Sequence, residues 1–240
     1  MINLIQKTTN TIPNNNNPYK YSIKTLNIVD SNTNFHSSSN SKKIKTYNKL
    51  QYFQKRTVDF FIGIFLALVT SPVMLYSLYK IKKESPGSIF FKQSRIGLNG
   101  KAFTCYKFRS MHSNSKFNPY TQKNDCRIFP YGRIMRRMRI DELPQLLNVL
   151  KGEMHLIGPR AEWDILVSDY EKIIPNYHDR HVVAPGITGL AQVMYHYGEN
   201  VEDAKNKLNY DLEYINTWSI FSEIKVMYKT IKVVLGKQGI

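Results

Sequence analysis

Asp141 and Glu142 are the residues whose types and position most directly suggest chemistry. These adjacent carboxylates follow the basic run GRIMRRMR at residues 132–139, and Pro144 comes two residues after Glu142. Proline is tolerated in the first turn of a helix because its missing N–H would have had no helical partner there. The pattern therefore predicts a helix that begins at Asp141 and ends at Gly152, since glycine often terminates helices.

Two roles for Asp141 are open from this pattern. In the first, its side chain is only an N-cap, kept ionised by the positive end of the helix dipole and the nearby arginines, which are surface charges. In the second, arginines such as Arg136 bind phosphate groups, and the Asp141 carboxylate either binds Mg²⁺ or attacks phosphorus as a nucleophile. Adjacent residues do not share a helix face, so Glu142 need not form an acid–base pair with Asp141.

Further cations occur at the end of a predicted strand and in turns. Lys107 and Arg109 are two residues apart and therefore share one face of a strand. Arg160 ends the segment LIGPR, and Arg180 precedes the turn PGITG. These positions favour a pocket for more than one phosphate, although a solvated basic edge also explains the strand pair. No Walker loop or GxGxxG fingerprint occurs, and His181, which lacks a second metal-type ligand at useful spacing, is expected to be packed or exposed.

The composition requires an anionic partner. The chain has 240 residues with 34 basic and 18 acidic side chains, a formal net charge of +16. Such an excess suits nucleic acid, anionic lipid or phosphorylated substrates. The two cysteines, Cys105 and Cys126, form no CxxC motif, so a zinc site or disulfide framework is not expected. The first 20 residues show no signal-peptide core, and the Asn- and Ser-rich residues 1–50 are predicted to be a disordered basic tail.

An uncharged run from Phe60 to Tyr79 predicts contact with a membrane. Its 20 residues are about the length that spans a bilayer as a helix. Ser71-Pro72 lies within the run, where proline removes a helical hydrogen bond, and lysines and arginines flank both ends. Basic residues prefer the cytoplasmic side, so we expect a helix that enters, breaks at Ser71-Pro72 and returns. A kinked spanning helix and a buried core helix are the alternatives.

The remaining residues predict a small mixed domain. Residues 88–111 have the pattern of two strands joined by a type I′ turn at Asn99-Gly100, and Pro130 can open a short helix. Two amphipathic helices follow, the first capped by Asn200. The second carries lysines opposite an apolar stripe, and it can lie on an anionic membrane or pack in the core.

The motifs taken together resemble the bacterial sugar transferases. The likeness covers roughly residues 52–237 and is carried by KRTVDFF…SP, GSIFFKQSRIGLNGKAFTCYKFRSM, RIDELPQLLNVLKGEMHLIGPR, PGITGLAQV and YGENVEDAKNKLNYDLEYI, in this order. These are monotopic phosphoglycosyl transferases, which load a sugar 1-phosphate onto a polyprenyl phosphate. The resemblance implies an α+β fold: a mostly helical, membrane-associated catalytic core with a small β-hairpin and an N-terminal re-entrant helix-hairpin. Residues 51–84 would be that re-entrant segment, turning at Ser71-Pro72, and residues 85–240 the cytosolic catalytic domain.

The resemblance also implies a reaction. Asp141 would attack the β-phosphate of a UDP-sugar, UMP would leave, and undecaprenyl phosphate would then take the phosphosugar from the aspartate with the help of Mg²⁺, which Asp141 would bind. Glu142 would be the partner acid. The implied substrate-binding residues are Lys107, Arg109, Arg136, Arg160, Arg180 and Asp211.

The resemblance further implies a location and partners. The protein would work at the bacterial inner membrane, with its catalytic domain on the cytoplasmic face and in contact with anionic lipid. No nucleic acid is expected as a partner, and a homo-oligomer is compatible with this assignment. The competing hypotheses are a membrane-attached basic module that binds anionic lipid or nucleic acid, which leaves the acid pair unexplained, and a spanning protein with its domain outside the cell.

Overall fold

The structure, a computed structural model, describes residues 44, 46–113, 115, 125–195 and 200–236. The predicted tail, residues 1–50, lies outside the described residues except for its last few positions. The described residues all fall in the unit Lys42–Ile240. Its elements are α1 (Lys49–Glu84), β1 (Phe90–Ile96), β2 (Ala102–Phe108), α2 (Pro130–Arg137), α3 (Leu146–Lys151), β3 (His155–Ile157), α4 (Asp164–Ile173), β4 (Gly186–Thr188), α5 (Leu190–Met194), α6 (Val201–Asn216) and α7 (Ile220–Leu235).

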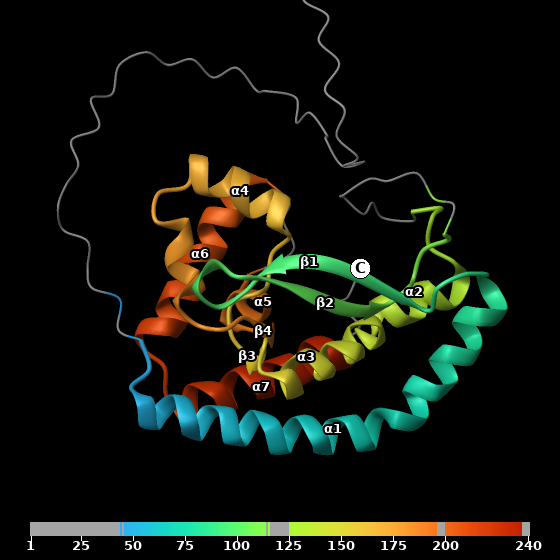
Figure 1. Ribbon diagram of the computed structural model, residues 1–240, viewed down its shortest axis with the longest axis horizontal. Helices are drawn as coiled ribbons and strands as arrows, with labels where there is room; N and C mark the ends of the chain where they lie inside the picture. The colour runs from blue at the N-terminus through green and yellow to red at the C-terminus, as the bar shows by residue number, and fades with distance from the viewer. Residues whose placement is uncertain (1–43, 45, 114, 116–124, 196–199, 237–240) are drawn as a thin grey trace, which may run out of the picture. The chain divides into compact units, whose positions relative to one another are not determined.

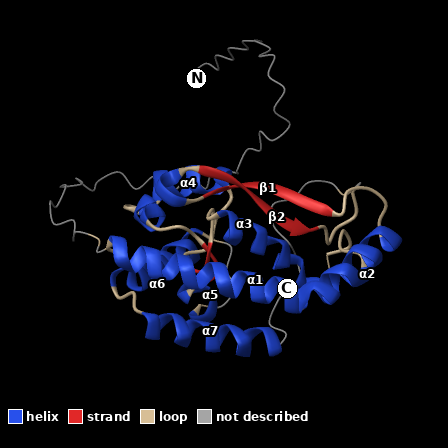
Figure 2. Ribbon diagram, turned by 60° about the horizontal axis from the view of Figure 1, so that its bottom comes forward, coloured by secondary structure: helices blue, strands red, loops and turns tan. Residues whose placement is uncertain are grey.

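The elements confirm an α+β fold that is mostly helical. Strands β1 and β2 form an antiparallel hairpin, and β3 pairs with β4 in parallel, which the sequence pattern did not predict. In the view of Figure 2 the hairpin lies at the top and α7 at the bottom, with α1, α5 and α6 between them and α4 beside the hairpin. A 3₁₀ turn at Ile140–Gln145, called here the 140–145 turn, connects α2 with α3.

The predicted hairpin turn is confirmed. Asn99 and Gly100 have φ values of 54° and 73°, the left-handed values that a type I′ turn needs at both central positions. The Lys101 N–H donates to the Leu98 carbonyl at 3.2 Å and closes the turn. Its register pairs Phe91 with Lys107, so the hairpin fixes where the Lys107 side chain lies.

Helix α1 does not break at Ser71-Pro72. Both residues lie within one helix from Lys49 to Glu84, and Figure 1 shows that helix curving, with its C-terminal part turning toward α2. Pro72 cannot donate to the carbonyl of Leu68, four residues earlier. The Ser71 hydroxyl donates to that carbonyl instead, at 2.7 Å. A local substitute for the lost hydrogen bond therefore lets the helix continue with a bend, where the sequence predicted a break.

Much of α1 is apolar and exposed. It is the one helix in the described part of the chain that is long and apolar enough to cross a membrane, and only 11% of its most apolar window is buried. Its exposed large side chains include Phe53, Phe61, Phe65, Leu68 and Leu75. An exposed apolar surface of this extent indicates contact with lipid or with another protein.

The basic residues before the apolar run of α1 point into the protein, whereas the sequence pattern indicated only that such flanks prefer the cytoplasmic side. Lys55 is buried, with its Nζ 2.5 Å from Glu223 Oε1 of α7 and 3.6 Å from Asp59 Oδ2. Arg56 donates to the carbonyls of Val149 and Leu150, the latter at 2.7 Å, near the C-terminal end of α3. A cation at that end of a helix satisfies carbonyls that have no helical partner.

A buried polar network around Glu223 joins α1 to the rest of the domain. His155 Nδ1 of β3 lies 2.6 Å from Asp59 Oδ2 of α1. The Tyr214 hydroxyl and the Trp218 indole N–H both donate to Glu223 Oε1, at 2.6 and 2.8 Å. Since each charge has a partner of opposite sign or a hydrogen bond, the network holds the first third of α1 in a defined place.

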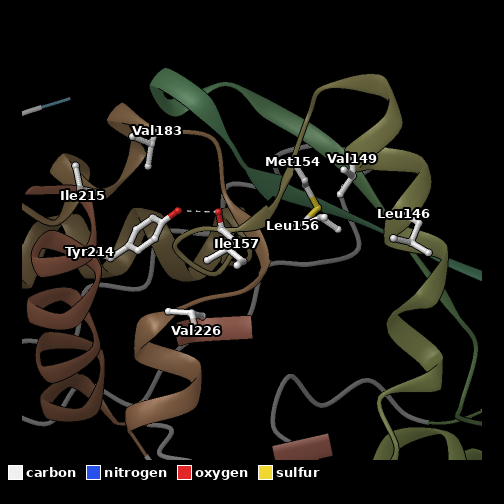
Figure 3. Packing of buried hydrophobic residues seen from close by; sticks show 9 residues of the cluster. All are labelled: Leu146, Val149, Met154, Leu156, Ile157, Val183, Tyr214, Ile215 and Val226. Carbon is white, nitrogen blue, oxygen red and sulfur yellow. Dashed lines mark hydrogen bonds between the residues drawn. The ribbon is translucent and has the colours of Figure 1, made fainter. Parts of the chain in front are cut away.

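Three apolar clusters complete the core of the described residues, and two of them contact α1. Figure 3 shows the largest one, in which side chains of α3, β3, α6 and α7 meet and the Tyr214 hydroxyl oxygen lies 3.0 Å from the Ile157 carbonyl oxygen. The second lies between the C-terminal part of α1, β2 and α2, around Ile81, Phe108 and Tyr131. The Ser77 and Tyr131 hydroxyls are 2.8 Å apart in this second cluster. Both parts of α1 are thus packed on the same domain.

We expect Lys55→Met to lower the free energy of unfolding by about 3–5 kcal/mol, because removing one partner leaves Asp59 and Glu223 buried without their cation. Chemical unfolding in detergent, followed by tryptophan fluorescence, measures this loss. Lys49→Met, at an exposed lysine of the same helix, is the matched control and should change it by less than about 0.5 kcal/mol. Equal effects of the two substitutions would contradict a structural role for the network.

Candidate active site

The 140–145 turn carries the two predicted carboxylates into the interior. Asp141 and Glu142 are both buried in it. Arg139, just before the turn, has φ 58° and ψ 20°, a left-handed conformation that is uncommon for a residue with a side chain. Asp141 therefore does not cap α3 as predicted, because the chain enters that helix through a 3₁₀ turn and Gln145 takes the cap position. The predicted stop at Gly152 is confirmed, with φ 86°.

Glu142 holds three cationic side chains around the turn. Its Oε1 lies 2.8 Å from Lys107 Nζ of β2, 3.4 Å from Arg160 Nη2 and 3.9 Å from Arg139 Nη1. Burial alone would raise the pKa of Glu142, but Lys107, Arg160 and Arg139 outweigh it and keep that pKa well below its usual range. Glu142 is therefore ionised and neutralised, and it fixes the positions of the cations.

Asp141 has the opposite environment. Its Oδ1 is buried and has no hydrogen-bond partner in the part of the chain that the structure describes. Burial, and then the charge of Glu142, raise the pKa of Asp141 to about 6, although Lys107, Arg136 and Arg139 act against them. This corrects the prediction that a helix dipole and arginines would favour its ionised form. Two neighbouring carboxyls with pKa values pushed apart are typical of functional sites.

Arg109 is placed away from solvent. Its guanidinium donates to the Pro86 carbonyl at 3.0 Å and also to the Ser85 carbonyl, in the segment that follows α1. Burial lowers its pKa. These contacts give Arg109 a structural task, joining β2 to the end of α1, in addition to the predicted binding of substrate.

Arg180 and Asp211 form a buried ion pair, with Arg180 Nη2 2.6 Å from Asp211 Oδ2. Arg180 also donates to the Tyr177 hydroxyl at 2.6 Å and to the Arg160 carbonyl at 2.9 Å. Burial alone would lower the pKa of Arg180, but Asp211 outweighs it and raises that pKa. The pair thus lies next to the Arg160 main chain and supports it through the hydrogen bond from Arg180. His181, the residue after Arg180, is buried, which was one of the two predicted options. Burial lowers the pKa of its imidazole to about 4.

The structure brings together Asp141, Glu142, Lys107 and Arg160 from among the predicted site residues. Arg136 lies close enough to affect the Asp141 carboxyl electrostatically. Sequence reasoning did not assign Arg139 to the site, although its position two residues before Asp141 was a usable signal. The arrangement combines several fixed cations with a carboxyl oxygen, Asp141 Oδ1, that has no hydrogen-bond partner among the described residues. This combination suits chemistry on a phosphorylated ligand.

A metal ion at this site would need ligands from the substrate as well as from the protein. Among the described residues, no group of three or more His, Cys, Asp and Glu side chains could hold a metal ion. Mg²⁺, however, is commonly held by one or two carboxylates together with substrate phosphates. The unpartnered Asp141 Oδ1 fits such a ligand, whereas Glu142 Oε1 is already engaged by cations.

Residues 50–237 match the family described as bacterial sugar transferase. A UDP-N-acetylgalactosamine-undecaprenyl-phosphate N-acetylgalactosaminephosphotransferase of Aeromonas hydrophila is 41% identical, over 78% of this chain and 45% of its own length. A UDP-glucose:undecaprenyl-phosphate glucose-1-phosphate transferase of Xanthomonas campestris pv. campestris is 40% identical, over 77% and 39% respectively. The exopolysaccharide production protein PSS of Rhizobium leguminosarum bv. phaseoli is 40% identical, over 74% and 92%. The chain thus spans less than half of the first two relatives and most of the third.

Asp141→Asn should stabilise the fold at alkaline pH. The pKa of the Asp141 carboxyl is about 6 in the folded protein and about 3.9 in the unfolded chain. Its protonation therefore makes its full contribution to stability below pH ~4, and this contribution is lost as the pH rises through the folded pKa. The two-unit difference corresponds to about 3 kcal/mol. We therefore expect the variant to exceed the wild type in unfolding free energy by up to about 3 kcal/mol at pH 8 and by little near pH 4.

Thermal and chemical unfolding at the two pH values measure this difference. Asp169→Asn makes the same substitution at a carboxylate on α4 that pairs with Lys172, and it serves as the control. The quantity to compare is the gain in unfolding free energy of Asp141→Asn over the wild type. A gain at pH 8 no larger than the gain at pH 4 would show that Asp141 is not a buried acid with a raised pKa.

Proposed function

Because the chain belongs to the bacterial sugar transferase family, we propose that it transfers a sugar 1-phosphate from a UDP-sugar to a polyprenyl phosphate, such as undecaprenyl phosphate. The names of the Aeromonas and Xanthomonas relatives support these substrate classes. The observation that carries the proposal is Asp141, a buried carboxyl whose Oδ1 has no partner in the described residues and which lies among fixed cations. The reaction would begin a polysaccharide or related glycan.

The proposed reaction has two displacements at one phosphorus atom. In the first, Asp141 attacks the β-phosphorus of the UDP-sugar, and the bond to the oxygen that bridges the two phosphates breaks. UMP leaves with that electron pair, and the phosphosugar is held as an acyl phosphate on Asp141. In the second, a phosphate oxygen of the polyprenyl phosphate attacks the same phosphorus and Asp141 leaves as a carboxylate. The product is a polyprenyl diphosphate sugar.

The cations make the first attack feasible. A carboxylate that approaches an anionic diphosphate is repelled, by about 4 kcal/mol per pair of unit charges at 4 Å in a partly solvated site. Lys107 and Arg160, positioned by Glu142, supply compensating charge where the diphosphate would lie. A pKa of about 6 leaves Asp141 ionised at neutral pH and more basic than an ordinary aspartate, which suits a nucleophile.

We propose Mg²⁺ as the cofactor. Asp141 would hold it together with the substrate phosphates, and when bound it would add positive charge next to the diphosphate. Lys107, Arg136 and Arg160 remain proposed phosphate-binding residues. Arg109, Arg180 and Asp211 remain proposed members of the wider site, in which Arg180 would act by supporting the Arg160 main chain.

The packing of α1 supports a monotopic, re-entrant association with the membrane. Near its start, Lys55 and Arg56 bind α7 and α3. Near its end, Ser77 contacts Tyr131, and Glu84 accepts a hydrogen bond from the Tyr131 N–H at 2.7 Å. Because both parts bind the same domain, a spanning α1 would leave one set of these buried contacts on the wrong side of the bilayer. We propose that α1 dips into one leaflet of the inner membrane, with the domain on the cytoplasmic face.

Helix α7 offers a second contact with the same membrane. Its residues Ile220, Phe221, Ile224, Tyr228 and Ile231 are exposed. Lysines of the same helix, among them Lys225 and Lys229, can attract anionic headgroups, at about 1 kcal/mol per basic residue near the surface. This arrangement supports anionic lipid as a partner.

Asp141→Asn should abolish UMP release from the UDP-sugar, because an amide cannot form the acyl phosphate. The two relatives named above differ in their sugar at 41% and 40% identity, so a screen of UDP-sugars with undecaprenyl phosphate comes first, with UMP as readout. We expect at least a 10³-fold loss for Asp141→Asn and near-normal rates for Asp169→Asn. Turnover by Asp141→Asn within tenfold of the wild type would rule out the covalent route.

The membrane topology can be tested with an introduced cysteine. The exposed Cys126 reports the side on which the domain lies. In the Asn48→Cys variant we expect both thiols to resist an impermeant reagent in intact cells and to react after lysis. Adding Pro72→Ala restores the N–H that α1 lacks, favours a straighter helix, and should raise labelling of position 48 from outside. Labelling of Asn48→Cys in intact cells without Pro72→Ala, while Cys126 stays protected, would contradict the re-entrant proposal.

A further inference from the structure

A groove of about 140 Å³ adjoins the Asp141 site. Its walls come from the middle of α1, the 140–145 turn, α5 and α7, and its lining includes Arg139 and Glu142. The rest of the lining is mostly aliphatic, with Leu66 of α1, Val193 of α5 and Val234 of α7 as examples. The groove therefore connects the charged site with the two helices whose apolar faces are exposed.

The hydroxyl groups in the groove are already used by the protein. The Thr188 and Thr230 hydroxyls are 2.8 Å apart, and Thr230 also donates to the Val226 carbonyl at 2.9 Å. The Thr70 hydroxyl donates to a carbonyl of its own helix at 2.7 Å. Gln192 donates an amide N–H to the Ile187 carbonyl at 3.1 Å, and its Oε1 has no hydrogen-bond partner within the part of the chain that the structure describes. A sugar or nucleoside has several hydroxyls that need hydrogen-bond partners, and it would find few of them here. A hydrocarbon needs no hydrogen bonds.

The size of the groove matches a short branched hydrocarbon. An apolar protein cavity of about 150 Å³ binds benzene, a six-carbon group. One isoprenoid unit has five carbons, so a groove of about 140 Å³ accommodates roughly one such unit. A longer chain would have to continue outside the groove.

Arg139 supplies charge beside this apolar space. Its side chain is 35% exposed, and its Nη1 lies 3.9 Å from Glu142 Oε1, farther than the Lys107 and Arg160 nitrogens. The left-handed backbone of Arg139, φ 58°, costs about 1–2 kcal/mol. Strain of this kind often occurs at functional sites, and here it sets an arginine between Asp141 and the groove. A ligand with a phosphate on a hydrocarbon chain has the complementary distribution of charge.

We propose that this groove binds the isoprenoid unit next to the phosphate of the polyprenyl phosphate acceptor, with Arg139 binding the phosphate itself. The inference rests on the proposed function and assigns the acceptor a place within it. The remainder of the acceptor chain leaves the groove along the exposed apolar faces of α1 and α7. Burial of the first unit brings the acceptor phosphate next to Asp141 and thereby presents it to the phosphosugar for the second displacement.

A pair of substitutions tests the proposal. Val234→Trp fills the groove, and Ile173→Trp places the same side chain on α4, where Ile173 is 59% exposed and does not line the groove. Each variant is measured in two assays: release of UMP from the UDP-sugar without acceptor, and transfer to undecaprenyl phosphate. For Val234→Trp we expect UMP release within threefold of the wild type, which also shows that the variant is folded, and kcat/KM for the acceptor lowered at least tenfold. Ile173→Trp should match the wild type in both.

Arg139→Asn gives an independent test of the phosphate contact. Asparagine tolerates the left-handed conformation, so the backbone of the turn is preserved while the charge is removed. We expect the KM for undecaprenyl phosphate to rise at least fivefold, with a smaller change in the rate of UMP release.

The outcomes are distinguishable. Acceptor kinetics of Val234→Trp equal to those of Ile173→Trp would overturn the assignment of the groove. An equal loss in both assays would also overturn it, because the groove would then serve the donor or the fold. An active wild type in either case leaves the proposed function standing. Absence of UMP release from every UDP-sugar by the wild type would instead remove the proposed function and the acceptor site with it.

Discussion

The attachment of three cations to one buried carboxylate is the constraint on which the site depends. Glu142 binds Lys107 from β2 and Arg160 from the segment after β3, and it draws Arg139 toward the same turn. These elements are far apart in the sequence, so Glu142 acts as their common anchor. Its own charge is neutralised in the process, and Asp141 is left as the neighbouring carboxyl without a hydrogen bond to its Oδ1. One acid therefore builds the electrostatic surroundings in which the other can react.

Features that depend on a few consecutive residues could be predicted from the sequence. The Asn99-Gly100 turn, the helix start at Pro130 and the helix stop at Gly152 follow from backbone preferences of those residue types. Within the site, the proximity of Asp141 to arginines was evident for the same reason. The resemblance over roughly residues 52–237 then added the expected reaction. Local patterns alone left the role of Asp141 open between a helix cap and a nucleophile.

Features that depend on distant partners could not be predicted. Lys55 resembled an interfacial lysine, but its partner Glu223 lies on the last helix. Arg180 resembled a phosphate ligand, but Asp211 holds it inside the domain. Even the predicted break in α1 failed because the Ser71 hydroxyl replaces the hydrogen bond that Pro72 cannot make. The sequence led us to expect both ends of α1 on the same side of the membrane because both ends are basic. The structure supports this expectation for a different reason, since both ends of α1 pack on the same domain.

The central claim is that the Asp141 carboxylate carries the phosphosugar between donor and acceptor. It is tested most directly by incubating the purified protein with an active UDP-sugar in the absence of acceptor, digesting it rapidly at low temperature, and mapping adducts by mass spectrometry. The account predicts a phosphosugar on the peptide that contains Asp141, in an amount close to the UMP released and removed when undecaprenyl phosphate is added before digestion. Stoichiometric UMP without any adduct, or an adduct on a residue outside the 140–145 turn, would contradict it.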